Sequence, residues 1–556
     1  MAERVFIGVA WPYANGSLHL GQIAGAYLSA DIFARYHRLK GNQILMVSGS
    51  DQHGTPITLR AEREGIKPES IAARYHSEFL DSFQRFGITF DLFTSTGTAN
   101  HARVAQDFFL NLLDKDYLYQ ATVSQPFCPR CQRFLSDRYI EGTCPYCQAD
   151  GARGDQCDDC GKPLSPAELV NPRCSFCSSA PEFRDSEHFF FRLSAFQDRL
   201  LEWVKQQTHW RQNVLNFTLR YLESGLKDRA ITRDMDWGVP LPLAGFEGKR
   251  LYVWFEAVIG YLSAAKEWAE SGGDAEGWRD YWQNNSAKSY YFIGKDNIVF
   301  HTIIWPAMLM GYGDLNLPYD VPANEFLMIE GRKLSTSRNW AVWLPDYLRR
   351  YDPDPLRYLL SAAMPETSDT DFSWREFVRR NNDELVATYG NLVHRVLTFT
   401  YRNFAGCVPT PSYGAERTQL QTSCAAILKS MDESLGRCQF KLALRQAMTL
   451  AQEANRYLDE KSPWKVIKQD KQAAADALYD AISVISCLRI ALYPFLPFSS
   501  QRLHEFLGFD DNIGDCGCEP RFPSPGQKLL SPNPLFTKLD EGLIEEELSR
   551  LGQGGS

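Results

Sequence analysis

The sequence predicts an α/β fold: a parallel sheet interrupted by an insertion and followed by a bundle of helices. Near the start of the chain, short apolar runs alternate with stretches of helical periodicity, which is typical of doubly wound sheets. Four Cys-x-x-Cys pairs interrupt this alternation, and it resumes after them. From about Trp374 the chain becomes a series of long helical segments. The 556 residues are too many for one core, so several domains are expected.

The predicted sheet begins with "RVFIGVA", a short apolar run that suits a buried parallel strand. The loop "WPYANGS" follows, and then a helical stretch that ends at Gly41. A second strand is predicted at "QILMVSGSD". Later strands and helices of the same sheet are predicted in "RLYVWFEAVIGYL", "SYYFIGKDNIVFHTIIWPAML" and "NEFLMIEG". We infer one Rossmann-type nucleotide-binding sheet, split by the insertion.

These patterns divide the chain into six parts. We expect the first half of a Rossmann-type catalytic domain at 1–118, an insertion at 119–235, the second half of the catalytic domain at 236–325, a connecting region at 326–373, a helical domain at 374–535 and a C-terminal tail at 536–556. Helices are predicted at 374–402, 416–435, 439–460, 464–492 and 497–508. The final "GQGGS" is expected to fray.

Composition sets limits on compartment and partners. No apolar run approaches the roughly 18 residues needed to span a bilayer, and the first residues lack a signal-peptide layout. We therefore expect a cytoplasmic protein without a membrane partner. In that reducing compartment the 14 Cys point to metal ligands or redox dithiols rather than to disulfides. A net charge of -9 argues against a sequence-independent DNA coat, although local basic patches can still bind a nucleic acid.

A candidate phosphate loop lies between the first strand and the first helix. In "NGSLHLGQIAGA", Gly16 and Gly21 allow the backbone to approach a ligand closely. The helix N-terminus offers free N–H groups to a phosphate, and His19 can donate to a phosphate oxygen. The alternative, a tight strand–helix turn with a surface histidine, is equally compatible with this segment alone.

Two short motifs and several longer stretches carry a family resemblance. "HLGQ" resembles the HIGH signature of class I aminoacyl-tRNA synthetases, with Gln22 in place of the last His. "GRKLSTSRNW" resembles their KMSKS signature, with Thr336 in place of the second Lys. "PYANGSLHLG", "GSDQHGTPI", "RDSEHFFF", "YVWFEAVIGY" and "FIGKDNIVFHTIIWPAML" resemble the methionyl-tRNA synthetase family in particular. The resemblance extends from about residue 4 to 510.

This resemblance implies a two-step reaction. Methionine and ATP would give methionyl-adenylate and pyrophosphate, and the methionyl group would then pass to the 3′ end of tRNA(Met), for initiation and elongation of translation. The first step is an in-line displacement at phosphorus, so catalysis should depend on positioning and charge stabilisation. By resemblance, His19 and Lys333 are the catalytic residues. ATP and its Mg²⁺ are expected at Asn15, Gly16, His19, Gly21, Gln22, Gly294, Lys295, Asp296, Lys333, Ser335, Thr336 and Ser337.

Arg338 is a candidate for the charge that Thr336 lacks. A Lys at position 336 would place a second positive charge on the triphosphate, and Arg338 stands two residues further along the same Ser-rich loop. The alternative is an ordinary solvated cation. For Lys295 and Asp296 the alternative is ordinary polarity at the start of a helix.

A methionine pocket is also implied by resemblance. Its expected residues are Trp11, Tyr13, Asp51, Trp254, Ala257, Val258, Tyr261 and His301. A thioether needs an aromatic and aliphatic sleeve, and the Asp51 carboxylate would bind the substrate ammonium. Trp254 and Tyr261 could instead be plain core, and Asp51 a helix cap. Relatives often carry Leu, Asp and Pro where this chain has Trp11, Glu256 and Val258.

The helical region carries a candidate anticodon site. Asn391 and Arg395 are four residues apart and would share one helix face, where an amide and a guanidinium can bind exposed base edges. Trp464 follows Pro463 at the start of a predicted helix and could stack on an unpaired base. The alternative is a surface polar pair and a packed Trp. The resemblance favours anticodon binding by all three.

The four Cys-x-x-Cys pairs predict two structural zinc ions, since two such pairs make one tetrahedral Cys₄ site. The resemblance implies a nested pairing: an inner zinc at Cys144, Cys147, Cys157 and Cys160, and an outer zinc at Cys128, Cys131, Cys174 and Cys177. The segment has few large apolar residues, so metal binding should stabilise it. A redox dithiol is the alternative for any single pair.

Three alternative functions compete with this prediction. A synthetase for a branched aliphatic amino acid would carry a larger editing insertion, and a cysteine-specific enzyme would show pocket residues that are lacking here. A catalytically impaired tRNA-binding paralogue is the alternative from another class, because both signatures are altered. The expected partners are tRNA(Met), ATP and L-methionine. The chain ends soon after the helical region, so we expect a monomer.

Overall fold

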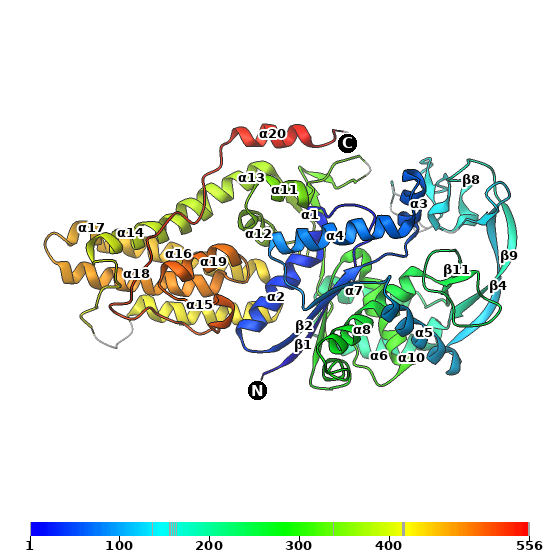
Figure 1. Ribbon diagram of the computed structural model, residues 1–556, viewed down its shortest axis with the longest axis horizontal. Coiled ribbons are helices and arrows are strands. Elements are labelled where there is room, and N and C mark those ends of the chain that lie inside the picture. The colour runs from blue at the N-terminus through cyan, green and yellow to red at the C-terminus, as the bar shows by residue number, and fades with distance from the viewer. Residues whose placement is uncertain are drawn as a thin grey trace.

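The protein, described by a computed structural model, has three regions in a row. A helical bundle lies at one end, a parallel sheet in the middle and the Cys-rich insertion at the other end (Figure 1). The structure describes residues 2–135, 137–154, 157, 159–160, 162, 164–336, 338–413 and 418–553. The predicted ATP-binding residue Ser337 lies outside these residues.

The central sheet contains five parallel strands in the order β14-β13-β1-β2-β3. Its strands are β1 (Arg4–Val9), β2 (Gln43–Ser50), β3 (Leu92–Ser95), β13 (Lys288–Gly294) and β14 (Ala323–Asn324). The first three precede the insertion and the last two follow it, so β1 and β13 are neighbours in the sheet although about 280 residues separate them. This confirms the predicted split Rossmann-type sheet.

Each face of the sheet has its own core. Ile7 of β1 packs on the side that continues into the helical bundle, whereas its neighbour Phe6 packs on the side of the insertion. The covering helices are α1 (Leu20–Gln22), the π-helical turn η1 (Ile23–Tyr27), α2 (Leu28–Leu39), α3 (Thr55–Glu64), α4 (Pro68–Phe86), α5 (Ala99–Asp114), α8 (Val253–Ser271), α9 (Arg279–Trp282), the π-helical turn η6 (Phe300–Ile304) and α10 (Trp305–Tyr312).

The insertion is built from two small antiparallel sheets. The longer one runs β10-β9-β4-β5, with β4 (Leu118–Cys128), β5 (Arg133–Phe134), β9 (Glu182–Phe191) and β10 (Arg229–Ala230). The shorter one, β7-β6-β8, contains β6 (Ile140–Thr143), β7 (Ala152–Arg153) and β8 (Val170–Cys174). Helices α6 (Gln197–Lys205) and α7 (Gln212–Glu223) and the hairpin β11 (Thr232–Asp234) and β12 (Lys249–Leu251) lead back to the central sheet.

A third small sheet connects the catalytic region to the bundle. It has the order β16-β15-β17, formed by β15 (Leu327–Ile329), β16 (Arg332–Lys333) and β17 (Thr370–Phe372). Helices α11 (Leu344–Arg350) and α12 (Pro353–Ala362) lie between its second and third strands along the chain. The predicted second signature begins in β16.

The helical region agrees with prediction in most of its helices. It contains α13 (Trp374–Arg379), the π-helical stretch η7 (Arg380–Gly390), α14 (Asn391–Asn403), α15 (Gln419–Gly436), α16 (Phe440–Lys461), α17 (Pro463–Val466), α18 (Lys471–Leu492), α19 (Pro497–Phe506) and α20 (Gly542–Arg550). The single helix predicted at 464–492 is wrong. Asp470 accepts hydrogen bonds from the backbone N of Gln472 and Ala473 and so begins a new helix.

The predicted fraying of "GQGGS" is wrong for its first two residues. The backbone N of Gly552 donates to the carbonyl of Asn339 at 3.0 Å, and the Asn339 side chain donates to the carbonyl of Gln553. These two hydrogen bonds attach Gly552 and Gln553 to the loop of the second signature. Residues 554–556 lie outside the described residues.

Candidate active site, anticodon surface and metal centres

His19 caps the helix that starts the first signature. Its Nδ1 accepts a hydrogen bond from the backbone N of Gln22 at 3.3 Å, and Gln22 Oε1 accepts one from the backbone N of His19 at 3.0 Å. Since Nδ1 accepts, the ring proton is on Nε2. Burial lowers the pKa of His19 to about 4, so the ring is neutral at pH 7. Gln22 therefore completes a capping box in place of the histidine that relatives carry.

The first signature is hydrogen-bonded to the residues that directly follow the second signature. The backbone N of Leu20 donates to Val342 at 3.1 Å, and that of Leu344 donates to Leu18 at 2.8 Å. The rings of His19 and Trp343 meet edge to face, 6.0 Å between centroids. More than 300 residues separate these segments in the sequence, and the fold brings them together beside the carboxyl ends of the parallel strands.

The second signature forms a short hairpin. Lys333 lies on β16, and Ser335 pairs with Trp340 across the turn. Gly21 allows close packing against this hairpin, because a Cβ there would lie 3.1 Å from both Leu334 and the His19 ring. Arg338 lies 3.7 Å from the Asp159 carboxylate of the insertion, and both side chains are exposed.

Lys295 is paired with carboxylates of its own chain. Its Nζ lies 2.8 Å from Glu325 and 2.6 Å from Asp369. It follows Gly294, the last residue of β13, in the short helix η5 (Lys295–Asn297). Burial raises the pKa of its neighbour Asp296. The segment thus lies at the carboxyl edge of the sheet, and the charge of Lys295 is largely compensated.

The predicted methionine pocket is assembled from four segments. Trp254, Ala257, Val258 and Tyr261 lie on α8, His301 on η6, Trp11 and Tyr13 after β1, and Asp51 after β2. His301 Nδ1 donates to the carbonyl of Asn297 at 3.0 Å, which leaves Nε2 to accept from the Tyr261 hydroxyl at 2.8 Å. Burial lowers the pKa of His301 to about 4. The pocket wall is therefore neutral and aromatic, which suits a thioether.

Trp11 fills a gap that two glycines leave open. A Cβ on Gly49 would lie 2.2 Å from the indole, and one on Gly260 would lie 2.8 Å from it. The Trp11 and Tyr261 rings meet edge to face at 6.3 Å. The large residue at position 11 is thus accommodated by the strand β2 and the helix α8, which flank it.

Asp51 lies beside a buried charge cluster that the sequence did not reveal. Glu256 of α8 accepts hydrogen bonds from His53 Nδ1 at 2.7 Å and from His101 Nε2 at 2.6 Å. Burial opposes the charge of Glu256, but His53 and His101 outweigh it and lower its pKa. Burial, followed by the Glu256 charge, raises the pKa of Asp51. His53 could have been suspected from its place in "SDQHG", whereas no sequence signal marks His101.

The predicted anticodon residues lie together on the helical region. Arg395 places its guanidinium over the Trp464 ring, 4.4 Å from the centroid. Asn391 and Arg395 are both exposed and both lie on α14, four residues apart. Trp464 is half-buried and packs against the core of the bundle, whereas Asn391 and Arg395 offer an exposed amide and guanidinium that can bind base edges.

The eight cysteines form two four-sulfur clusters. One contains Cys128, Cys131, Cys174 and Cys177, and the other Cys144, Cys147, Cys157 and Cys160. Four Sγ–Sγ distances are 3.5 and 3.9 Å in the first cluster and 3.9 and 3.6 Å in the second. A tetrahedron with Zn–S bonds of about 2.3 Å has edges of about 3.8 Å. Both clusters therefore have the size of a zinc site, and the grouping is the nested one that the family resemblance implied.

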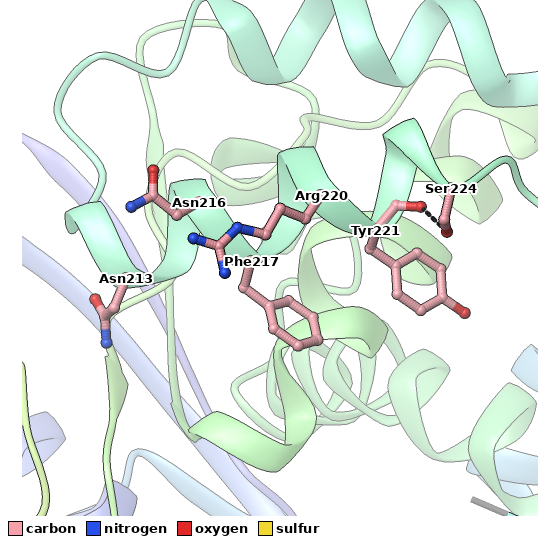
Figure 2. A pocket seen from close by; sticks show the side chains of 6 residues that line it. All are labelled: Asn213, Asn216, Phe217, Arg220, Tyr221 and Ser224. Atoms are coloured by element: carbon pink, nitrogen blue, oxygen red, sulfur yellow. Dashed lines mark hydrogen bonds between the residues drawn. The ribbon is translucent and has the colours of Figure 1, made fainter.

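A surface hollow of about 620 Å³ lies elsewhere, on the outer face of α7. Figure 2 shows its lining side chains, which are Asn213, Asn216, Phe217, Arg220, Tyr221 and Ser224. Asn213 donates to Glu325 at 2.7 Å and so touches the pair that holds Lys295. None of the six was a predicted site residue.

A split parallel sheet whose two signature segments meet above its carboxyl edge defines a class I aminoacyl-tRNA synthetase. The family model for class I tRNA synthetases (M) matches residues 5–397, and the model for the anticodon binding domain of methionyl tRNA ligase matches residues 408–554. The chain therefore belongs to the methionyl-tRNA synthetase family.

Individual relatives agree with this assignment. A methionine–tRNA ligase of Dehalococcoides mccartyi is 64% identical over 553 residues, covering 99% of this chain and 100% of the relative. One from Thermomicrobium roseum is 53% identical, covering 99% of each chain. The solved structure of Mycobacterium tuberculosis methionyl-tRNA synthetase in complex with methionyl-adenylate superposes with a TM-score of 0.79 at 25% identity, covering 96% of this chain and 100% of that one.

These matches confirm the predicted family, the fold class and the assignment as an aminoacyl-tRNA synthetase. In the described part of the chain, no helix is both long and apolar enough to cross a membrane.

Proposed function

We propose that this chain activates methionine with ATP and transfers the methionyl group to the 3′ end of tRNA(Met). The observation that carries the proposal is the pairing of the first signature with the residues directly after the second signature, beside the aromatic side chains predicted to line a pocket with Asp51. This arrangement can hold a triphosphate and an amino acid side by side at the carboxyl edge of the sheet. The 64% identity to a methionine–tRNA ligase supports the choice of amino acid.

In the proposed complex, Asp51 binds the ammonium of methionine and the wall of Trp11, Tyr261 and His301 surrounds its side chain. Tyr13, Trp254, Ala257 and Val258 complete the pocket. The ammonium supplies the positive partner that lowers the raised pKa of Asp51. The Glu256 cluster holds His53 next to Asp51 and thereby fixes the carboxylate.

The substrate carboxylate oxygen then attacks the α-phosphorus of ATP, and pyrophosphate leaves. His19 donates from Nε2 to the phosphate charge that develops, as a neutral hydrogen-bond donor. Asn15, Gly16, Gly21, Gly294 and Asp296 shape the nucleotide site. Lys333 and the hydroxyls of Ser335, Thr336 and Ser337 hold the leaving pyrophosphate, and Mg²⁺ enters with ATP.

Arg338 provides, in this proposal, the second positive charge that Thr336 lacks. Its exposed pair with Asp159, at 3.7 Å, is weak enough to exchange for a phosphate. The test is Arg338→Ala beside Lys333→Ala. The proposed role of Arg338 is wrong if Lys333→Ala abolishes adenylate formation while Arg338→Ala leaves it unchanged.

Asn391, Arg395 and Trp464 bind the anticodon in the proposed tRNA complex. Trp464→Ala and Arg395→Ala should each raise the KM for tRNA while leaving methionine activation unchanged, because the site lies on the helical region. Binding should weaken as salt rises.

Two zinc ions are proposed as structural cross-links of the insertion, one in each Cys₄ cluster. The Cys128 sulfur accepts a hydrogen bond from the backbone N of Cys131 at 3.4 Å, which helps to hold it in the cluster. We further propose a monomer that acts in the cytoplasm, with the domain boundaries given by the sequence.

The test of the proposed function is ATP–pyrophosphate exchange measured with each of the twenty amino acids. Methionine should be strongly preferred, and purified tRNA(Met) should then accept the methionyl group. An absence of exchange with every amino acid would instead support the impaired paralogue.

A further inference from the structure

Residues 536–553 leave the helical bundle and run back towards the second signature, ending in the red helix α20 above α13 and α11 (Figure 1). The segment is fastened along its way. The Asn381 side chain donates to Thr537 at 2.9 Å, and Asn382 makes two hydrogen bonds of 2.9 Å with Leu539. These side chains lie on η7, so the segment is attached to the helix that leads into the anticodon-binding surface.

Glu547 anchors α20 to the catalytic region. Only 2% of its surface is exposed, and its carboxylate lies 2.9 Å from the Arg350 guanidinium and 2.8 Å from the Tyr351 hydroxyl. Leu543, Ile544 and Leu551 pack on the same core. Arg350 ends α11, the helix that directly follows the second signature, so the anchor lies close to the signature hairpin.

Beyond α20 the segment contacts the signature hairpin itself. Gly552 and Gln553 hydrogen-bond with Asn339, as described above. Asn339 also accepts a hydrogen bond from Trp343 Nε1 at 2.8 Å. Trp343 meets the His19 ring edge to face. A continuous set of contacts therefore connects the segment, through Asn339 and Trp343, to the first signature.

Asn339 needs such support. Its φ of +50° lies in the left-handed region, which Asn tolerates better than most residues with a side chain but which local hydrogen bonds must still stabilise. Its two partners, Trp343 on one side and the segment on the other, fix this turn of the hairpin. Thr336 replaces a lysine whose positive charge would help to order the loop around a triphosphate. The loop therefore depends more on its contacts with the rest of the protein.

We infer that residues 536–553 are a positioning strap, which holds the signature hairpin in the conformation that receives the triphosphate of ATP. This inference rests on the role of the hairpin in the proposed function. A hairpin ordered in advance does not lose conformational freedom when ATP binds or when the transition state forms. The strap therefore assists adenylate formation and takes no part in the later transfer to tRNA.

The test compares a chain that ends at Leu551 with one that ends at Gln553. Both lack 554–556 and both retain α20, but only the longer one keeps the two residues that contact Asn339. The shorter chain should lose about tenfold in kcat/KM for ATP in methionine-dependent pyrophosphate exchange. Its methionine affinity, its thermal midpoint and the single-turnover transfer from preformed adenylate to tRNA should match those of the longer chain.

A pair of full-length variants tests the anchor. Glu547→Gln removes the buried ion pair with Arg350. Glu546→Gln alters the adjacent exposed residue, whose carboxylate is paired with Arg550. Only Glu547→Gln should lower kcat/KM for ATP.

Equal kcat/KM for ATP in the two shortened chains overturns the strap. So does an equal loss in activation, methionine affinity and transfer, since that indicates general damage to the fold. If the full-length chain shows no exchange with any amino acid, the proposed function fails first and the strap fails with it.

Discussion

At the scale of single residues, His301 makes the stability of the folded chain depend on pH. In the folded chain its pKa is lowered to about 4, whereas an unfolded histidine titrates near 6.5. Between these values the unfolded chain binds the extra proton, so stability falls as pH falls through this window. The urea midpoint should therefore drop less between pH 7 and pH 5 in His301→Gln than in the parent chain. An equal drop in both would contradict the assignment.

Glu256 is the second residue with a testable role. Its buried carboxylate accepts one hydrogen bond from each of two histidines. In Glu256→Gln the amide oxygen can still accept one of them, but the other imidazole N–H faces the amide NH2 group, which cannot accept. Breaking a buried pair of this kind costs about 3–5 kcal/mol. We expect that loss of unfolding free energy in urea titrations, together with a higher KM for methionine, because His53 lies next to Asp51.

Glu256→Asp is the matched control, since it keeps the charge and shortens the side chain by one methylene. It should lose less stability than Glu256→Gln. If Glu256→Gln is as stable as the parent chain, the histidines do not depend on this carboxylate.

At the scale of elements, the two Cys₄ clusters should bind zinc independently of each other and act as separate structural cross-links. Each contains cysteines from two pairs, and the core around them is small and distinct from the cores of the sheet and the bundle. Cys144→Ser and Cys128→Ser should each reduce zinc from about two ions per chain to about one. One zinc in the parent chain, with Cys128 or Cys174 open to alkylation, would refute the outer site only.

Elements were predictable where a local pattern determines them. The periodicity at 439–460 gave α16 (Phe440–Lys461) to within one residue. The break between α17 and α18 was missed because the helical periodicity continues across it. The break depends on the Asp470 side chain, which competes locally with the backbone hydrogen bonds of a continuous helix. The zinc grouping needed the family resemblance, since four neighbouring pairs allow more than one combination.

At the scale of the whole molecule, contacts between distant segments could not be read from the sequence. The Glu256–His101 pair joins residues 155 positions apart, and the contact of Asn339 with Gln553 joins residues 214 positions apart. Neither has a periodicity or a spacing that marks it. The signature residues were found because their motifs are local, whereas the residues that support them depend on the completed fold.

Arg357 provides a test of how the helical bundle is joined to the catalytic region. It is fully buried and donates to Asp31 of α2 at 2.7 Å, to Phe495 at 2.8 Å and to Pro494 at 2.9 Å. Asp31 lies on the helix that continues from the first signature, and the two carbonyls lie in the turn between α18 and α19 of the bundle. The Arg357 guanidinium therefore helps to fix the orientation of the bundle relative to the active site.

Arg357→Met should remove these bonds and leave buried carbonyls without a donor, which costs about 3–5 kcal/mol of unfolding free energy. Arg349→Met, at an exposed arginine whose partner is Asp346, is the control and should change stability by less than about 1 kcal/mol. With the bundle less firmly oriented, the anticodon and the 3′ end of one tRNA can no longer be bound together as well. We therefore expect Arg357→Met to lower kcat/KM for tRNA in aminoacylation while methionine-dependent pyrophosphate exchange stays near the parent value. A parallel fall of both activities would show that Arg357 supports the catalytic region alone.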